Sequence, residues 1–452
     1  MKPQLRILFI LYFMFSLSSC EDFLDEKPDI KLKDASTLAD LHALLNNTAV
    51  MNYYTMGIGE ASADNYYLET AAWQSLPQHE RDMYIWEGEI FHQFYLNAWL
   101  DYYQTVYYSN YILKKLEEFS SGGTDLNLSS EIKGKAVFFR GFAFFKLLTL
   151  FSKAYDKQTA STDLGIPLRL DDDFNTKSER ASVESCYRQI IIDLELAAQL
   201  LPNSSANKHS PSKNAAFILL SWVHLAMQEF EGASGYAEKS LQISDRLLNY
   251  KNYNAAENYP FVTGNDENVF TVASGSLGLL GYWNAKIDTT LFKSYADGDF
   301  RKSLFFGKNS DGSAFFKGSY TGSNGLFMGL TTADAYLNIA ESLIRMNRVF
   351  EGLAYLEKLL KMRYQANAIP NLPYNSTQSA LELVLEERRK EFVMRDSRWI
   401  DIKRLNKHAD NSISIKRILR ELKVELKPND NRYALPLPQE IIELTGMQQN
   451  PH

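Results

Sequence analysis

The sequence has too few cysteines for a disulfide framework. Only Cys20 and Cys186 occur among its 452 residues, so a disulfide-stapled scaffold is excluded. If Cys20 is chemically modified, Cys186 has no partner. Cys186 shares one helical stripe with Ile190, Leu194 and Ala197, and this pattern predicts a buried, inert thiol.

The sequence also lacks an excess of positive charge. Its formal net charge is -7 and its pI is about 5.7, whereas domains that bind nucleic acids usually carry a basic footprint. We therefore expect no nucleic-acid partner.

Familiar catalytic and cofactor motifs are missing from the chain. It contains no Gly-rich phosphate loop, no G-x-S-x-G nucleophile elbow and no HExxH zinc motif. The seven histidines show no spacing that is typical of metal ligands. The sequence therefore predicts a protein that is not an enzyme and that holds no cofactor and no metal.

Long hydrophobic runs are absent after the first 20 residues. No later segment offers 18 consecutive apolar residues, so no transmembrane helix is expected there. At the start, Lys2 and Arg6 precede the apolar stretch Leu8–Phe15, which is shorter than the roughly 20 residues that a membrane span needs. Residues 1–19 therefore predict a secretory signal peptide that is removed.

A cysteine follows this apolar stretch directly. Leu17, Ser18, Ser19 and Cys20 resemble a bacterial lipobox, which implies cleavage before Cys20 and acylation of its sulfur and its new amino group. Several acyl chains anchor a protein stably without a transmembrane helix. The acidic stretch Glu21–Glu26 resembles the signal that exports lipoproteins to the cell surface, although a simple solvated tether would look similar.

Apolar residues recur at three- and four-residue spacing along most of the chain, which predicts a mostly α protein. A long helix is expected from Phe91 to Phe119, with Trp99 in its core stripe. The stretch 131–151 is apolar nearly all round and predicts a central helix that packs on several sides. A polar loop is expected at 152–180. Further helices are expected at 36–47, 183–201, 212–230, 233–248, 332–347, 350–366, 377–395 and 398–406.

The region 250–330 has a different character. It lacks a sustained hydrophobic period and is rich in Gly, Asn, Asp and aromatic residues. This composition predicts long ordered loops with a few short strands. Loops of this length inside a compact protein usually have a function.

Two helix pairs in the sequence resemble each other. The tripeptides Phe230–Gly232 and Phe350–Gly352 each lie between two predicted helices. Such pairs resemble tetratricopeptide units of roughly 34 residues, which stack into a curved scaffold. Thr331 and Asp334 fit a capping box at the start of the helix 332–347. The matched positions are Phe217 with Leu337, Leu220 with Ala340, Val223 with Leu343 and His224 with Ile344.

An ordered set of segments resembles the SusD/RagB family over nearly the whole chain. The most specific segment is Glu387–Phe392 followed by Arg398–Arg404. Met394–Ser397 departs from the family pattern, which usually has more glycine in this turn. The other segments are Cys20 with Phe23–Asp25 and Pro28, Ala136–Leu148 closing with Gly165–Pro167, Asp299–Arg301, Lys317–Tyr320, Ala333–Glu341, Leu435–Glu440 and Gln449–Pro451.

The resemblance implies a location and a function. Members of this family lie as lids over a TonB-dependent outer-membrane transporter, a SusC-like barrel. They capture oligosaccharides, or less often peptides, and deliver them to that barrel. The resemblance therefore implies an outer-membrane protein that is lipid-anchored, faces the cell surface and contributes binding rather than catalysis.

Three carboxylates resemble the paired acids of a glycoside hydrolase: Glu386, Glu387 and Glu391. They lie beside cationic residues on one predicted helix, and ion-paired carboxylates stay ionised instead of serving as an acid. A charged helix that is packed by salt bridges to Arg398 or Arg404 is the interpretation that we favour.

Other polar features have structural explanations. Asp171–Asp173 resembles a calcium loop, but Thr176 and Ser182 stand where an EF-hand needs Gly and Glu, so a solvated acidic loop is expected. His224 matches an isoleucine in the other helix pair and is expected in the core. Trp222 lies in the same helical pattern and is expected there too.

The ligand site is expected on loops that combine aromatic rings with amides and carboxylates, because sugars stack their apolar faces on Trp and Tyr. The resemblance agrees, since the family builds its ligand face from an early loop and the middle loops. For each residue, ordinary packing is the alternative. The candidates are Asp64, Asn65, Tyr66, Tyr67 and Trp73 in the first segment, and Tyr282, Trp283, Asn284 and Tyr295 in the second.

The sequence as a whole predicts one mostly helical domain, residues 20–452, that captures an extracellular glycan for import. Three other functions stay open. A lid of the same architecture could bind peptides, or a helical adaptor could dock on the transporter without a ligand. An enzyme of glycan breakdown would need a cleft with two facing acids.

Overall fold

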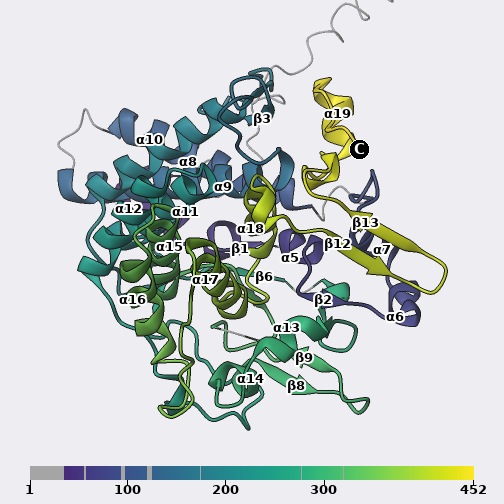
Figure 1. Cartoon of the computed structure of the whole chain (residues 1–452). Helices are drawn as coiled ribbons and strands as arrows, with labels where there is room; N and C mark the ends of the chain where they lie inside the picture. The colour runs from purple at the N-terminus through teal and green to yellow at the C-terminus, as the bar shows by residue number, and fades with distance from the viewer. Residues whose placement is uncertain are drawn as a thin grey trace, which may run out of the picture.

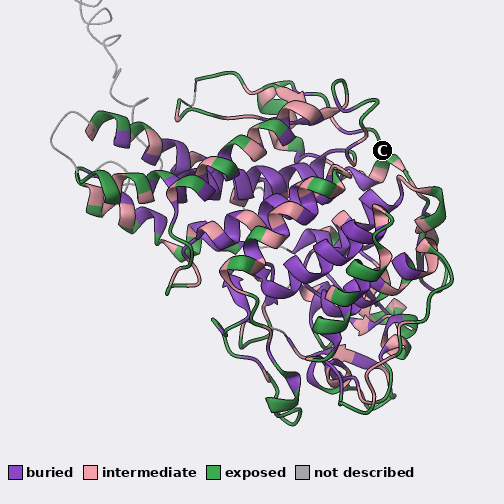
Figure 2. Ribbon diagram, turned by 60° about the vertical axis from the view of Figure 1, so that its left-hand side comes forward, coloured by how far each residue is buried: buried purple, intermediate pink, exposed green. Residues whose placement is uncertain are grey.

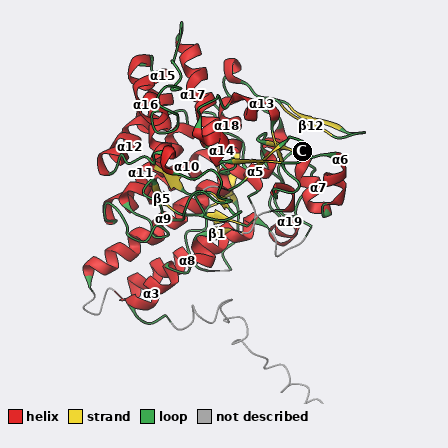
Figure 3. Cartoon of the chain, turned by 90° about the horizontal axis from the view of Figure 1, so that it is seen from below, coloured by secondary structure: helices red, strands yellow, loops and turns green. Residues whose placement is uncertain are grey.

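The computed structural model of the protein consists mainly of helices, and its strands are short (Figure 1 and Figure 3). The predicted signal peptide and Cys20 lie outside the described residues. Among the residues that are described, no helix is both long enough and apolar enough to cross a membrane. The described ranges are 35–54, 57–92, 97–119, 125–173, 175–275, 277–318 and 320–452.

A series of paired helices forms the scaffold, and each helix packs against the next one. The last helix before the irregular region also packs against the first helix after it. This arrangement confirms the predicted mostly α fold with tetratricopeptide-like helix pairs. The helices are α8 (Ala98–Phe119), α9 (Leu126–Phe151), α10 (Val183–Leu200), α11 (Lys213–Ala226), α12 (Phe230–Ile243), α15 (Thr332–Arg345), α16 (Val349–Leu360) and α17 (Thr377–Glu391).

The central helix of the scaffold is α9. Almost every residue from Gly134 to Phe151 is buried, because α9 packs against α8 and α10 and also against the short helix α3 (Leu38–Leu45). Figure 2 shows this buried character along the inner helices. The helix begins earlier than predicted because the Asp125 carboxylate accepts hydrogen bonds from the first free amides.

The prediction of a helix that starts at Phe91 is wrong. Phe91 and His92 are not helical, and α8 begins at Ala98. The Asn97 side chain accepts a hydrogen bond of 2.8 Å from the amide of Leu100, which satisfies a free amide at the helix N-terminus. The other predicted helices are all present. The central helix ends at Phe151, as expected, and the remaining ones end somewhat earlier than expected.

The two matched helix pairs share a point of close approach. A β-carbon on Gly232 would lie 2.7 Å from Nδ1 of His224, and one on Gly352 would lie 2.7 Å from Cγ1 of Ile344. His224 and Ile344 are matched positions in the sequence. Each glycine therefore lets the second helix of its pair approach the first at the same place.

Local predictions about caps and buried residues are confirmed. The hydroxyl of Thr331 donates to the carboxylate of Asp334 at 2.6 Å in the capping box that opens α15. Cys186 is a buried free cysteine, and burial raises the pKa of its thiol to about 11. Trp99 and Trp222 are buried as well.

The irregular region between α12 and α15 contains loops, short strands and short helices, as predicted. One of its strands pairs in parallel with a strand from the N-terminal part, and the other pairs are antiparallel. The pairs are β1 (Tyr53–Tyr54) with β6 (Ala273–Ser274), β6 with β10 (Leu326–Phe327), β5 (Asn268–Phe270) with β11 (Leu330–Thr331), β2 (Tyr66–Tyr67) with β7 (Lys286–Ile287), and β8 (Phe306–Lys308) with β9 (Ala314–Phe316).

Two further antiparallel pairs lie outside this region. The predicted loop 152–180 contains a strand that the sequence did not reveal, and a C-terminal hairpin projects from the body (Figure 1). The remaining elements are β3 (Leu164–Pro167) with β4 (Arg180–Ser182), β12 (Ile415–Ile418) with β13 (Lys423–Leu426), and α4 (Thr48–Met51), α5 (Ile58–Ser62), α6 (Thr70–Ser75), α7 (Gln78–Tyr84), η2 (Tyr250–Asn252), η3 (Gly278–Leu280), α13 (Thr289–Ser294), α14 (Phe300–Leu304), α18 (Arg398–Leu405), η4 (Ala409–Asn411), η5 (Asn431–Tyr433) and α19 (Gln439–Thr445).

A buried network of charges joins the irregular region to the scaffold. The Arg363 guanidinium, which follows α16, donates hydrogen bonds of 2.8 Å to the carboxylates of Glu267 and Glu391. Arg301 in α14 lies 2.6 Å from Glu387 and 3.2 Å from Glu391. All five side chains are buried. Because an unpaired buried charge is costly, this network fixes how the loops lie against α17.

The turn before α18 has an unusual backbone. Met394 has a φ angle of 57° and Asp396 one of 56°, in the left-handed region that favours glycine. The Asp396 carboxylate accepts the amide of Glu60 at 2.9 Å, the Glu60 carboxylate accepts the amide of Asp396 at 3.0 Å, and Nζ of Lys146 lies 3.0 Å from Asp396. These contacts hold a non-glycine residue in this conformation.

Candidate functional site

The two segments that were predicted to form a ligand face lie side by side. Strand β2 pairs with β7, and this places Tyr67 opposite Lys286. The Glu80 carboxylate in α7 accepts hydrogen bonds from the amides of Gly278 and Leu279 at 3.0 and 2.5 Å. These contacts hold the early segment against the turn that leads into the second segment.

Three aromatic side chains form a platform on this face: Tyr282, Trp283 and Phe315. Tyr282 is 49% exposed and Trp283 is 60% exposed, and Phe315 is half-buried. The centroid of the Tyr282 ring lies 4.9 Å from that of Trp283 and 5.7 Å from that of Phe315. We call these three residues the aromatic platform. It offers a contiguous apolar surface to solvent.

Two glycines lie directly beneath the platform. A β-carbon on Gly281 would lie 2.7 Å from Cε2 and Cζ2 of Trp283. Gly307 is the partner of Phe315 in the β8–β9 pair, and a β-carbon there would overlap the Phe315 ring. The Trp283 and Phe315 rings therefore rest on bare backbone, which holds them in place before a ligand arrives. Such preorganisation lowers the entropy cost of binding.

Charged side chains lie beside the platform. Lys286 in β7 donates hydrogen bonds to the carboxylates of Glu69 and Asp311, and β7 packs next to β9, which carries Phe315. The hydrogen bond from Lys286 holds the pKa of Asp311 well below its usual range. The site therefore presents carboxylate oxygens, which accept hydrogen bonds, next to exposed rings.

Three of the predicted ligand contacts are wrong, because Asn65, Tyr66 and Tyr295 are buried. The Asn65 amide donates a hydrogen bond of 2.8 Å to the carboxylate of Glu60. The hydroxyls of Tyr66 and Tyr295 donate to backbone carbonyl oxygens at 2.7 and 2.8 Å. These residues support the face from inside.

The other predicted residues are partly accessible, and several are tied to the protein. Asp64 lies 2.7 Å from Arg398 and 3.3 Å from Arg389. Burial alone would raise the pKa of Asp64, but the two guanidinium groups hold it well below its usual value. Trp73 and Asn284 donate side-chain hydrogen bonds to backbone carbonyl oxygens at 3.1 and 2.9 Å. Among the predicted residues, Tyr282 and Trp283 are the ones that face solvent most openly.

Phe315 is the member of the platform that the sequence did not reveal. It lies between two buried residues of β9, Ala314 and Phe316. Successive side chains of a strand point to opposite faces, so one ring of the Phe-Phe pair points outward and the other inward. With no clear strand period in the sequence, nothing indicated which ring would be outside.

The candidate acids on α17 are structural, as we favoured, but their predicted partners are wrong. Glu387 lies 2.5 Å from Lys390 and contacts Arg301. The predicted partners Arg398 and Arg404 bind carboxylates outside α17. Helical patterning shows where charges lie on a helix, but it does not show which distant residue meets them.

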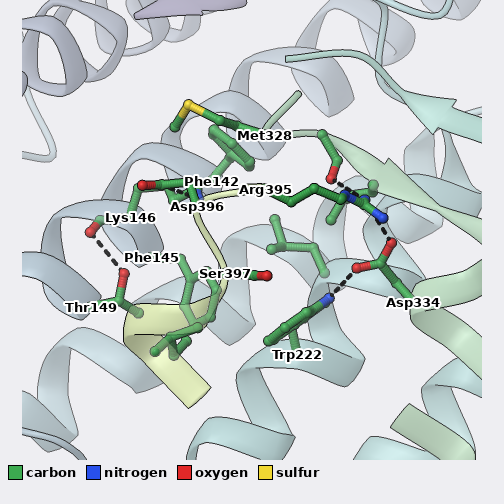
Figure 4. A pocket seen from close by; sticks show the side chains of 14 residues that line it. Phe142, Phe145, Lys146, Thr149, Trp222, Met328, Asp334, Arg395, Asp396 and Ser397 are labelled. Carbon is green, nitrogen blue, oxygen red and sulfur yellow. Dashed lines mark hydrogen bonds and ion pairs between the residues drawn. The ribbon is translucent and has the colours of Figure 1, made fainter. Parts of the chain in front are cut away.

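A small cavity beside the turn before α18 is also structural. Its volume is about 50 Å³, which has room for a few water molecules. Figure 4 shows Trp222 and Arg395 pointing toward Asp334, with hydrogen bonds of 2.8 and 3.1 Å to its carboxylate. Lys146 and Asp396 line another side of the cavity (Figure 4). The cavity is too small for a sugar ring and is lined by groups that hold helices together.

The acidic loop Asp171–Asp173 is solvated at Asp171 and Asp173, as predicted. The Asp172 side chain is only 9% exposed and forms an ion pair of 2.8 Å with Lys114. In the described part of the chain, no group of three or more His, Cys, Asp or Glu side chains is arranged to hold a metal ion. His224 is half-buried, and its Nδ1 lies 2.7 Å from the Glu229 carboxylate.

Two family models match the sequence. A SusD-like model, described as starch-binding and associating with the outer membrane, matches residues 22–225. The SusD family model matches residues 307–452. Outside these matches lie the first 21 residues and the central region 226–306. The chain belongs to the SusD/RagB family.

Several solved structures share the fold. A SusD superfamily protein from Bacteroides thetaiotaomicron is 22% identical with a TM-score of 0.77, over 92% of this chain and 100% of that one. A SusD superfamily protein from Bacteroides vulgatus is 20% identical with a TM-score of 0.76, over 92% and 99% of the two chains. A SusD-like carbohydrate binding protein from the same species is 20% identical with a TM-score of 0.70, over 91% and 96%. A comparison with curated proteins found no match.

Proposed function

We propose that this protein captures an extracellular glycan on the aromatic platform and does not cleave it. The observation that carries the proposal is the pair of solvent-facing rings, Tyr282 and Trp283, with the Trp283 ring resting on the backbone of Gly281. Sugar rings have apolar C–H faces that stack on such rings. The neighbouring carboxylates of Glu69 and Asp311 are placed to accept hydrogen bonds from sugar hydroxyls.

The surrounding charges support binding over hydrolysis. A glycosidase needs two carboxyl groups in one cleft, one of which is protonated. Asp311 is held ionised by Lys286. Glu387 and Glu391 of α17 are paired inside the protein, and Glu386 pairs with Lys390 at the surface. The family description as starch-binding and associating with the outer membrane agrees with a binding role.

We extend the proposal to the place of action. Acylation at Cys20 anchors the protein in the outer membrane with residues 20–452, as one domain, facing the cell surface. There the protein delivers its glycan to a TonB-dependent transporter, a SusC-like barrel. The proposal rests on the lipobox-like sequence at residues 17–20, on membership of the SusD/RagB family and on the exposed platform.

Weak binding is expected from the chemistry. A sugar exchanges hydrogen bonds with water for similar bonds with the protein, so ring stacking supplies most of the net gain. A dissociation constant of about 1 μM to 1 mM follows, which corresponds to roughly 4–8 kcal/mol. Such a value also lets the protein release its cargo to a transporter.

Calorimetry with a panel of oligosaccharides and peptides tests the proposal, with product analysis on the same samples. We expect heat from at least one oligosaccharide and intact ligand after the titration. Cleavage products would show an enzyme instead. A response to peptides with none to any oligosaccharide would show a peptide-binding lid. If no ligand gives a heat of binding, the protein would be an adaptor that docks on the transporter without binding a ligand.

A further inference from the structure

A second cavity lies far from the aromatic platform. It has a volume of about 260 Å³ and lies between α8, residues 167–172 with Ser178, and α19. In Figure 1, β3 and α19 lie at the top of the molecule, whereas β8 and β9 lie at the bottom. The cavity is therefore separate from the site proposed above.

One wall of this cavity is a row of aromatic rings on α8. Trp99, Tyr103 and Tyr107 line it, and their four-residue spacing places them on one face of the helix. The ring centroids of Trp99 and Tyr103 are 4.8 Å apart. The Tyr103 hydroxyl donates a hydrogen bond of 2.8 Å to the carbonyl of Pro167, which fixes this ring. The other apolar lining residues are Leu100, Val106, Pro167, Ile441 and Met447.

The polar rim of the cavity belongs to a loop that α8 holds in place. The Asn110 amide donates hydrogen bonds of 2.9 Å to the carbonyls of Arg169 and Asp171. The Arg169 guanidinium in turn donates to the Asp171 carboxylate at 3.4 Å. Burial raises the pKa of Tyr107 to about 12, and the charge of Asp172 adds to this rise. The carboxylates of Asp171 and Asp172 therefore lie at the edge of the aromatic row, on backbone that Asn110 holds in place.

We propose that this cavity is a second carbohydrate site, which binds a single neutral sugar ring. The apolar face of a pyranose stacks on the half-buried rings of Tyr103 and Tyr107, and the buried Trp99 ring supports Tyr103 from inside. Asp171, Asp172 and Ser178 line the same cavity, and their oxygens accept hydrogen bonds from the sugar hydroxyls.

The size and charge of the cavity limit the class of ligand that it can bind. Pockets for drug-sized ligands have volumes of about 300–1,000 Å³, so a cavity of about 260 Å³ suits one ring and excludes a folded chain or a peptide helix. The carboxylates of Asp171 and Asp172 pair with Arg169 at 3.4 Å and with Lys114 at 2.8 Å, so the charges at the cavity rim are balanced and leave no net charge to attract a charged sugar. A neutral ring is therefore favoured over a uronic acid or a sulfated sugar.

Saturation-transfer NMR with the methyl glycosides of glucose, galactose, mannose, xylose and N-acetylglucosamine tests this inference. The Trp283→Ala protein is the starting point, because it lacks the centre of the platform. We expect at least one glycoside to bind it. Adding Tyr107→Ala or Asp171→Ala should weaken that binding by about tenfold or more, the loss expected for a stacking face or a charged hydrogen bond.

Two outcomes would overturn the second site. One is that no glycoside gives a signal with the Trp283→Ala protein. The other is that the signal survives unchanged when Tyr107 or Asp171 is replaced. The Asp171 side chain is 51% exposed, so the Asp171→Ala protein should fold normally. If the Tyr107→Ala protein does not fold, the binding measured with Asp171→Ala decides the question. Tryptophan amide, an aromatic cation without a sugar ring, is titrated as well. If it binds and no glycoside binds, the cavity is a site for aromatic cations and the proposal is refuted.

Discussion

Replacing Arg363 by Met should strongly destabilise the protein, since it removes the shared partner of two buried carboxylates. The guanidinium contacts Glu267 and Glu391 at 2.8 Å, and all three side chains are fully buried. Methionine fills a similar volume but leaves both acids without this partner. Breaking a buried ion pair from one side costs about 3–5 kcal/mol, so we expect a loss in that range at neutral pH.

The loss should depend on pH with a definite sign. Burial already raises the pKa of Glu267 above its usual value. Without the guanidinium, the two neighbouring acids repel each other, so the pKa of Glu267 in the folded state rises further above that of the unfolded chain. The pKa of Glu391, which Arg363 helps to lower in the wild type, rises as well. The folded variant then binds more protons than the unfolded chain, so its stability increases as the pH falls.

Denaturant melts of both proteins at about pH 7.5 and about pH 5.5 measure this effect. The difference between wild type and Arg363→Met should be smaller at the lower pH. Lys361→Met is the matched control, because Lys361 forms an exposed pair with Glu357 and such pairs contribute about 0–1 kcal/mol. A loss below about 1 kcal/mol for Arg363→Met at both pH values would refute the structural role of the network.

Three further predictions concern other parts of the chain. Trp399→Ala should lower the free energy of unfolding by about 3–5 kcal/mol, because Trp399 is 1% exposed and its ring centroid lies 5.0 Å from that of Tyr433. A denaturant melt that shows a loss below about 1 kcal/mol would place Trp399 outside the core. Burial raises the pKa of Glu60 from 4.5 to about 7, so its contribution to stability is full below pH 4.5 and is lost as the pH rises through about 7. Carbon-13 NMR should show one glutamate titrating near pH 7 whose signal is absent in Glu60→Gln, and a spectrum with every glutamate titrating below about pH 6 would contradict this. Cys20→Ala should abolish fatty-acid labelling and membrane fractionation, whereas persistent label would disprove the anchor.

The helical scaffold was predictable because its signals are local. The all-round apolar stretch of α9 and the matched positions around Gly232 and Gly352 lie within single helices or adjacent pairs. Helix ends were less predictable, since one capping side chain decides them. Asn97 starts α8 seven residues after the predicted start at Phe91, and hydrophobic spacing contains no information about this cap.

The candidate site illustrates the limits of the sequence at the level of single residues. The β2–β7 pairing places the two predicted segments side by side. In β2, however, Tyr66 is buried and its neighbour Tyr67 is half-buried, and composition does not distinguish two adjacent tyrosines. The partners of buried charged side chains could not be predicted from the sequence either. Arg398 binds Asp64, which lies more than 300 positions away in the chain, and no local pattern indicates such a contact.

The most direct test of the account is the glycan affinity of the wild type compared with Trp283→Ala and Tyr374→Ala, measured by calorimetry with one oligosaccharide that binds. Tyr374 is 46% exposed between α16 and α17 and serves as the matched surface aromatic. We expect Trp283→Ala to lose about 1–3 kcal/mol of binding free energy, the burial value of one ring face, with an unchanged melting temperature. Tyr374→Ala should bind like the wild type. Equal affinity of all three proteins would contradict the assignment of the aromatic platform as the ligand site.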